Sequence, residues 1–316
     1  MKNKPIIIIA GDPDSIFIEI LSKTLKTKKF KSPIVLICNK SVFINQFNIK
    51  NSITKLNILN PKDLNAKILF PDQINLINVN LKNFTKQNKL KYLKESFEIG
   101  LNLIKKNFSY KLINGPINKE FFLNKRFPGL TEYIAHSFKV KKIGMLIFNK
   151  KLAVSPVTTH LPIKLVSKKI TKSLIIEKIF LINEFYKKNF NFIPKIAVTG
   201  LNPHCESILK FNEDKSIVSK AIDYAKKRKI NVEGPYSGDT IFLKLNRIKF
   251  DVIVGMYHDQ VLSPIKTLYE FDAINITMGL PFLRISPDHG PNRKMFGKNK
   301  SNPLSLIRSL EFLDKK

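Results

Sequence analysis

Short apolar runs alternate along the chain with polar stretches in which apolar residues recur every three or four positions. The apolar runs predict buried strands at residues 5–10, 34–38, 111–113, 144–148, 152–157, 195–199, 252–254 and 273–277. The spaced stretches predict helices at residues 17–25, 42–47, 90–107, 131–138, 174–186, 216–228 and 303–313. Residues 50–80 have weak periodicity and are assigned short strands and loops. Strands that alternate with helices predict an α/β fold, with a second lobe beginning near Gly129.

Charge is the outlying feature of the composition. The 55 basic and 24 acidic residues give a formal net charge of +31. Such an excess is the first sign of nucleic-acid binding, but it also fits a lysine-rich solvated surface with a bias toward anionic substrates. The lysines recur throughout the sequence, and neither zinc-finger spacing nor an aromatic RNA-binding signature accompanies them. We therefore expect no nucleic-acid partner, and a basic nucleic-acid-binding protein is the alternative from another class.

The remaining composition favours a cytoplasmic globular protein. No apolar run approaches the roughly 20 residues of a membrane span, so no membrane partner is expected. The apolar start at residues 5–10 continues into Gly11-Asp12-Pro13 rather than into a cleavage site, which favours a first strand over a signal peptide. Cys38 and Cys205 are too few for a disulfide framework.

One stretch, from Asp251 to Lys266, looks like part of a site. The apolar run Val252–Val254 breaks at Gly255 into a polar turn that carries Tyr257, His258, Asp259 and Gln260. In open α/β sheets, ligands bind outside the carboxyl ends of the strands. The turn after this strand is therefore predicted to face a ligand.

Three of the five histidines share one local context. His160, His204 and His258 each follow a predicted strand, in a turn that contains Pro or Gly. Imidazole suits zinc and other first-row divalent ions, and three protein ligands with an open position describe a catalytic metal site. We therefore predict a metal bound by these three residues. His136 falls within a predicted helix and is given a structural role, and His289 fits either role.

Groups that bind anions fall near the same predicted turns. Lysine and arginine there are suited to hold a phosphate and a carboxylate. The candidates are Lys119, Thr131, Lys266, Asn275 and Arg284. Arg284 is the most specific of them, because arginine is scarce in this chain and its neighbours are apolar. Asp239 and Asp259 either accept hydrogen bonds from the histidines or cap turns.

These residues lie in blocks that resemble one enzyme family, the 4-hydroxythreonine-4-phosphate dehydrogenases of pyridoxal phosphate biosynthesis. The likeness runs from Ile7 to about Leu306. The blocks are Gly11-Asp-Pro13, Asn114-Gly-Pro-Ile-Asn-Lys119, Gly129-Leu-Thr-Glu-Tyr133, Thr158-Thr-His-Leu-Pro162, Gly200-Leu-Asn-Pro-His204, Gly234-Pro235 through Asp239-Thr240, Met256-Tyr-His-Asp-Gln260, Asn275-Ile-Thr-Met-Gly-Leu-Pro281 and Asp288-His-Gly290. So many ordered blocks are far more specific than any single motif.

The resemblance implies a two-lobed α/β/α fold like that of isocitrate and isopropylmalate dehydrogenases, with the active site in the cleft between the lobes. Lobe one would hold residues 1–128 and 275–316, and lobe two residues 129–274. The family binds NAD or NADP without the G-x-G-x-x-G fingerprint, which is absent here. No residue is assigned to the cofactor.

The resemblance also implies a divalent metal (zinc, magnesium or cobalt) on His160, His204 and His258. The site would be shared across a homodimer, with the partner subunit's His258 as the third ligand. Substrate contacts are implied for Thr131, Lys266, Asn275 and Arg284. The expected reaction is oxidation of 4-phosphooxy-L-threonine at C3 with decarboxylation to 3-amino-2-oxopropyl phosphate. His258, Lys266 and Asp239 are the candidate catalytic residues; the base is Lys266, Asp239 or a water.

Three departures from the family pattern stand out. The first block continues as Asp14-Ser-Ile-Phe-Ile-Glu19, Leu130 replaces a histidine, and Pro291-Asn-Arg-Lys294 follows Gly290 where small residues are usual. Leu130 removes one expected substrate contact. A paralogous dehydrogenase of another phosphorylated four-carbon hydroxy acid is therefore the nearby alternative.

Overall fold

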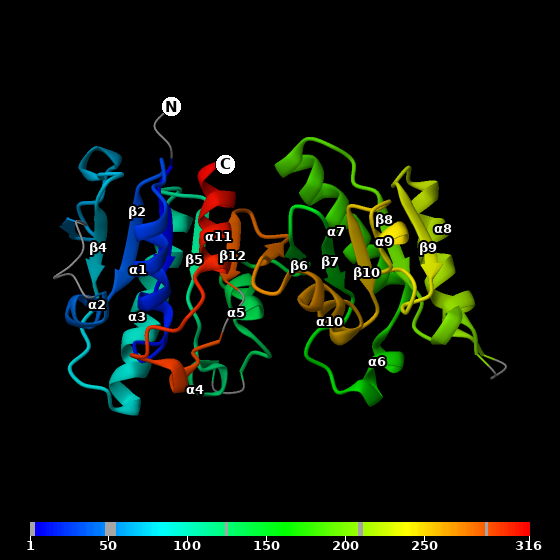
Figure 1. The fold of residues 1–316 in the computed structure, drawn as a ribbon, viewed down its shortest axis with the longest axis horizontal. Helices are drawn as coiled ribbons and strands as arrows, with labels where there is room; N and C mark the ends of the chain where they lie inside the picture. Colours follow the sequence, from blue (N-terminus) through cyan, green and yellow to red (C-terminus); the bar gives the residue numbers. More distant parts are fainter. Residues whose placement is uncertain (1–3, 48–54, 124–125, 208–210, 288–289) are drawn as a thin grey trace. The chain divides into compact units, whose positions relative to one another are not determined.

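The chain folds into two compact α/β units (Figure 1). The structure is a computed structural model that describes residues 4–47, 55–123, 126–207, 211–287 and 290–316. Unit 1 comprises Met1–Lys139 with Leu280–Lys316, and unit 2 is Val140–Gly279. The expected α/β class is confirmed.

The unit boundaries differ from those that the sequence suggested, near 128/129 and 274/275. Helix α5 (Leu130–Ser137) belongs to unit 1, because its Thr131 accepts a hydrogen bond from Arg284 of strand β12 (Leu283–Pro287). Strand β11 (Ile274–Met278) belongs to unit 2, because it pairs along its whole length with β6 (Gly144–Phe148).

Unit 1 is built on a parallel sheet in the order β3-β4-β2-β1-β5-β12. Besides β12, its strands are β1 (Ile6–Ile9), β2 (Ile34–Cys38), β3 (Leu56–Leu59), β4 (Ile74–Asn78) and β5 (Lys111–Asn114). The four isoleucines of β1 are completely buried, as expected for a parallel strand covered on both faces.

The helices of unit 1 cover both faces of this sheet. Besides α5, they are α1 (Phe17–Thr27), α2 (Lys40–Phe47), α3 (Lys86–Lys105), α4 (Lys119–Leu123) and α11 (Leu304–Asp314). Helix α3 packs on β1, β2 and β5, whereas α1 and α11 pack on each other. The crossover through α1 leads from β1 to β2, its neighbour on one side. The crossover through α3 leads from β4 to β5, the neighbour of β1 on the other side. Right-handed crossovers of opposite direction place their helices on opposite faces.

Unit 2 has a mixed sheet in the order β11-β6-β7-β10-β8-β9. Strands β6 and β7 (Ala153–Pro156) are antiparallel, whereas β7, β10 (Val252–Gly255), β8 (Ile196–Thr199) and β9 (Val232–Tyr236) run parallel. The helices are α6 (Ile163–Lys169), α7 (Lys172–Phe190), α8 (Lys220–Lys227), α9 (Lys244–Arg247) and α10 (His258–Tyr269). A π-helical turn, Asp214–Ser219, precedes α8.

The stretch that follows β10 differs from the prediction. The sequence suggested a polar turn reaching Lys266, but His258–Tyr269 is a helix, α10. Val261 and Ile265 form its buried stripe and pack in the core with Ile253. Pro264 lies inside the helix, where proline removes a backbone hydrogen bond. Because proline is unfavourable there, the sequence pattern did not predict a helix. Lys266 therefore lies on a helix and not in a turn.

Candidate active site

The three predicted histidine ligands follow three adjacent parallel strands of unit 2. His160 comes after β7, His258 after β10 and His204 after β8, and β10 is hydrogen bonded to both other strands. Because the strands are parallel, their carboxyl ends meet at one edge of the sheet. We call the segments 157–162, 199–205 and 255–260 the histidine loops.

Met256 ties two of these loops together through its backbone. Its carbonyl accepts a hydrogen bond from the Thr158 hydroxyl at 2.7 Å, which anchors the loop of His160. Its N–H donates to Gln260 Oε1 at 2.6 Å within the loop of His258. Gly255 allows this close turn, because a Cβ there would lie 2.4 Å from Val261.

Gln260 extends the connection to the third loop. Its Nε2 donates to the Gly200 carbonyl at 2.7 Å, and its Oε1 also accepts from the Thr199 hydroxyl at 2.9 Å. A Cβ added to Gly238 would lie 3.3 Å from Gln260 Nε2, so the loop of Asp239 approaches as well. One amide therefore sets the spacing between the loops of His204 and His258.

His160 and His258 lie side by side, with ring centroids 5.9 Å apart. Nδ1 of His258 is 2.6 Å from Oδ1 of Asp259. A carboxylate at Nδ1 favours the tautomer whose Nε2 carries the free lone pair. Asp259 is therefore a hydrogen-bond partner of a predicted ligand, which is one of the two roles suggested for it.

The loop of His204 is held in an unusual backbone conformation. His204 and Cys205 have φ values of 53° and 60°, and left-handed non-glycine residues cost roughly 1 kcal/mol or more each. The carboxylate of Asp214, which is completely buried, opposes this strain. It accepts from the backbone N–H groups of Leu201 at 2.6 Å and Asn202 at 3.1 Å.

Asp239 lies close enough to His204 for the two side chains to interact electrostatically. The Ser237 hydroxyl donates to its carboxylate at 2.6 Å and lowers its pKa, and His204 contributes in the same direction. The group is exposed and stays ionised, so it is a weak base at neutral pH.

The three histidines are not gathered into a metal-binding set within one chain. Among the residues that the structure describes, no three His, Cys, Asp or Glu side chains of a single chain are placed to hold a metal ion. The rings of His160 and His258 are in contact.

A second cluster in unit 1, the Arg284 cluster, contains Arg284, Asn114 and Thr131. Arg284 is 3% exposed; it donates through Nε to Asn114 Oδ1 at 2.8 Å and through NH1 to Thr131 Oγ1 at 2.9 Å. Burial lowers the pKa of the guanidinium to about 10, opposed by Glu132, so the group remains charged at neutral pH. A buried, oriented guanidinium is suited to bind a phosphate or carboxylate.

The other predicted site residues are scattered. Lys266 lies on α10, about 12 Å along the helix axis from His258, and burial lowers its pKa. Asn275 is half-buried in β11, and His136 lies in α5 as expected. His289 and the side chain of Lys119 lie outside the described residues.

Two residues of these clusters have roles that the sequence did not predict, although Gln260 lies in the turn predicted to face a ligand. Asn114 ends β5 and orients Arg284; its position directly after a strand was its only signal. Gln260 connects the histidine loops, and that role depends on the strand order β7-β10-β8, which the chain order does not reveal.

The fold places the chain among two-unit α/β proteins that include dehydrogenases. A β-decarboxylating dehydrogenase from Thermococcus kodakarensis has the same fold, with a TM-score of 0.51 and 14% identity over 98% of this chain and 82% of that one. A 4-hydroxythreonine-4-phosphate dehydrogenase from Klebsiella pneumoniae is far more similar, with a TM-score of 0.84 and 26% identity over 99% of both chains.

Sequence comparison establishes the family. Residues 29–313 match the model of the pyridoxal phosphate biosynthetic protein PdxA. A 4-hydroxythreonine-4-phosphate dehydrogenase from Zymomonas mobilis is 30% identical over 97% of this chain and 94% of its own length. The chain belongs to the PdxA family, and the resemblance inferred from its motifs is confirmed.

Two further relatives bear on the activity. A 4-hydroxythreonine-4-phosphate dehydrogenase from Sulfurihydrogenibium sp. (strain YO3AOP1) is 43% identical, but the match spans 63% of each chain. A protein of Bradyrhizobium diazoefficiens with the provisional name D-threonate 4-phosphate dehydrogenase is 36% identical over 70% of this chain and 68% of its own.

Proposed function

We propose that the chain catalyses the NAD(P)-dependent oxidation of 4-phosphooxy-L-threonine at C3, with decarboxylation to 3-amino-2-oxopropyl phosphate. The reaction belongs to the biosynthesis of pyridoxal 5′-phosphate, and we place it in the cytoplasm. The observation that carries the proposal is the set of three histidine loops at adjacent strand ends, braced by Gln260, in a member of the PdxA family. The names of its relatives supply the reaction.

His160, His204 and His258 would hold the divalent metal. The donor set fits: three imidazoles suit zinc or cobalt better than magnesium, which prefers oxygen. Asp259 orients the His258 ring for this role. When bound, the metal supplies Lewis-acid stabilisation of the charge that develops on the C3 oxygen, and NAD(P)+ accepts the hydride.

We propose that the ligand set is completed in a homodimer, with the partner subunit's His258 joining His160 and His204. All three lie in loops that end the same sheet edge. In a closed twofold dimer, each chain can contribute its own His258 to the partner's site and take the partner's His258 into its own site.

The anionic groups of the substrate are assigned to the Arg284 cluster. Arg284 and Thr131 are pre-oriented by their mutual hydrogen bond, and burial strengthens the attraction of the guanidinium for a phosphate or carboxylate. Asn275 offers an amide that can both donate and accept.

The C3 hydroxyl must lose its proton to a base as the hydride leaves the C3 carbon. When the carboxylate then leaves as carbon dioxide, the electrons of its bond to C2 form an enolate with the new C3 carbonyl, and C2 takes up a proton to give the product. Of the side chains considered as the base, Lys266 fits better than Asp239. Burial lowers the pKa of Lys266 and increases its neutral fraction, whereas the lowered pKa of Asp239 weakens that carboxylate as a base.

The test is an NADH absorbance assay with 4-phosphooxy-L-threonine, with and without divalent metal. His258→Ala is expected to lower metal-dependent turnover by about 100-fold or more, as loss of a metal ligand does. His136→Ala is the matched control, because His136 is exposed in α5 of unit 1 and should leave turnover nearly unchanged. Near-normal turnover of the metal-free wild type would contradict the proposal.

One observation favours a second candidate, a D-threonate 4-phosphate dehydrogenase. Leu130, where the family has histidine, is 6% exposed at the start of α5, beside Thr131. A buried leucine offers no hydrogen bond to a substrate, and a relative bears the name of this activity. Assaying D-threonate 4-phosphate in the same experiment separates the two, since the true substrate will have the higher kcat/KM.

A further inference from the structure

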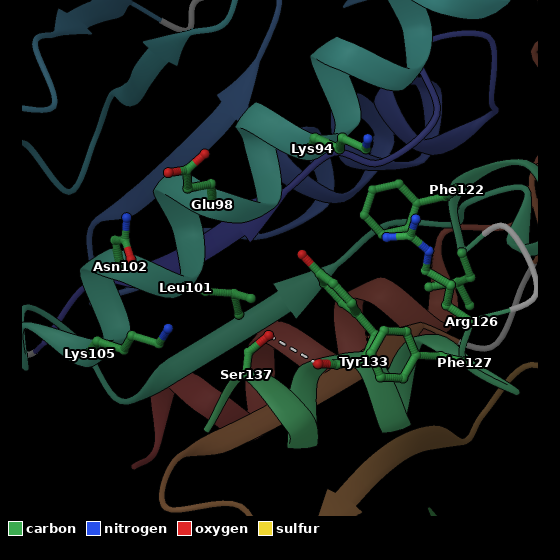
Figure 2. A pocket seen from close by; sticks show the side chains of 11 residues that line it. Lys94, Glu98, Leu101, Asn102, Lys105, Phe122, Arg126, Phe127, Tyr133 and Ser137 are labelled. Carbon is green, nitrogen blue, oxygen red and sulfur yellow. Dashed lines mark hydrogen bonds between the residues drawn. The ribbon is translucent and has the colours of Figure 1, made fainter. Parts of the chain in front are cut away.

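A pocket of about 370 Å³ lies within unit 1 among helices α3, α4 and α5 and residues Arg126 and Phe127 (Figure 2). It involves none of the residues assigned above to metal or substrate. Its lining combines apolar side chains, here called the base, with charged side chains, here called the rim, and in Figure 2 the hydroxyl of Tyr133 is directed inward between them. The lining residues include Leu101, Phe122, Phe127 and Tyr133 with Lys94, Glu98, Lys105 and Arg126.

The apolar part of the pocket is a cluster of aromatic rings centred on Tyr133. Its ring packs edge-on against Phe122 at 5.4 Å, Phe127 at 5.6 Å and Phe97 at 6.2 Å between centroids. Phe122 is 7% exposed and Leu101 4%, so the base is rigidly packed. Burial raises the pKa of Tyr133, with a smaller contribution from Glu98, so the hydroxyl remains a neutral donor.

The rim carries an excess of positive charge. Lys94, Lys105 and Arg126 oppose the single carboxylate of Glu98, which leaves two positive charges. Within the described part of the chain, neither Lys94 nor Arg126 is engaged in an ion pair. Both lie toward the end where Phe122 is found, whereas Lys105 lies at the other end near Ser137 (Figure 2).

We propose that this pocket binds a phosphate monoester carried on a single aromatic ring. The ring packs on Tyr133 and Leu101, and the phosphate is held by Lys94 and Arg126. A phosphate monoester carries close to two negative charges at neutral pH, which matches the excess of the rim. The volume lies at the small end of ligand pockets, so one ring fits better than a dinucleotide. Arg126 adds bidentate recognition.

The test uses isothermal titration calorimetry of the full chain with phenyl phosphate, which carries a phosphate monoester on a single aromatic ring. Methyl phosphate, which lacks the ring, and benzyl alcohol, which lacks the charge, are the comparison ligands. Phenyl phosphate is expected to bind about 10-fold or more tightly than either, because aromatic packing and charge act together.

Variants locate the binding. Lys94→Ala with Arg126→Ala is expected to weaken phenyl phosphate binding about 10-fold or more, whereas Lys91→Ala with Lys106→Ala should change it less than 2-fold. Lys91 and Lys106 are exposed on or beside α3 and do not line the pocket. Both pairs remove two cations, so the comparison separates a pocket from the general charge of the chain.

Arg284→Met separates this pocket from the proposed substrate site, and phenyl phosphate binding is expected to survive it. Three outcomes overturn the proposal: no measurable binding, equal loss in the two double variants, or loss in Arg284→Met alone. Failure of the dehydrogenase assay would not affect it, since binding is measured without turnover.

Discussion

Two buried cations of unit 1 have different surroundings and different roles. Arg284 is 3% exposed and Lys111 is 1% exposed. Arg284 contacts Asn114 at the carboxyl end of β5, where ligands bind, whereas Lys111 begins the same strand at the opposite end. Lys111 donates to the Ser32 hydroxyl at 3.2 Å. Arg284 is therefore at the end of the strand where the proposed function requires an anion-binding group, whereas the burial of Lys111 lowers stability.

Lys111→Met is expected to raise the free energy of unfolding by about 1 kcal/mol at neutral pH, because removing a buried charge outweighs one hydrogen bond. Burial lowers the pKa of Lys111, opposed by Asp314. Below the ordinary lysine pKa of about 10.4, the unfolded chain therefore binds more protons than the folded chain. The free energy of unfolding of the wild type thus increases as the pH rises toward that value. The advantage of methionine should therefore shrink between pH 7 and about pH 9.5.

Urea unfolding at the two pH values measures this difference. Lys106→Met is the control, because Lys106 is exposed at the end of α3 and should change stability by less than about 0.5 kcal/mol at either pH. A Lys111→Met variant less stable than wild type at both values would show that the bond to Ser32 outweighs the burial.

At the scale of elements, the histidine loops depend on one side chain. Gln260 bonds to the Met256 N–H, the Gly200 carbonyl and the Thr199 hydroxyl. Gln260→Leu keeps the volume and removes all three bonds, so stability should fall by about 3 kcal/mol or more, given roughly 1–3 kcal/mol for each of the three groups left unpaired. Metal affinity should fall with it, because the loops of His204 and His258 lose their common anchor.

Denaturant unfolding and metal titration of Gln260→Leu would be compared with Gln87→Leu. Gln87 is exposed in α3, so its replacement should leave both quantities nearly unchanged. If Gln260→Leu loses stability but binds metal as the wild type does, Gln260 supports the fold without positioning the ligands.

The same elements show what the sequence could and could not predict. Strands β1 and β2 were found closely, because four or five consecutive apolar residues are typical of a strand covered on both faces. Strand β9 and helix α6 were missed: β9 contains Gly234 and Pro235, and α6 is a short helix with only Val166 buried. Arg284 was recognised by its apolar neighbours, but its partner Asn114 depends on the pairing of β5 with β12.

At the scale of the whole molecule, the formal net charge bears on which ligands gather around the chain. The described helices include none with the length and apolarity to cross a bilayer. The formal net charge of +31 raises the local concentration of anions around the chain. At the two proposed sites, the Arg284 cluster and the pocket lined by Tyr133, that general attraction would act on any phosphorylated ligand, and the buried or packed groups would provide the selectivity.

Assembly of the metal site is the remaining question at this scale. Within the described residues of one chain the three histidines do not form a ligand set, although His160 and His258 are neighbours. Two arrangements predict different behaviour of mixed dimers. Either each site takes His258 from the partner, or each chain brings its own three histidines together when metal binds.

Mixed dimers of His160→Ala and His258→Ala chains separate these arrangements. If the partner subunit's His258 completes each site, one site of the mixed dimer contains both substitutions and the other contains neither. Random pairing makes half of the dimers mixed, and each mixed dimer has one intact site of two. Activity should therefore recover to about one quarter of the wild-type value. The readout is NADH formation after the inactive variants are unfolded and refolded together. No recovery, with mixed dimers confirmed by two affinity tags, would place all three ligands in one chain.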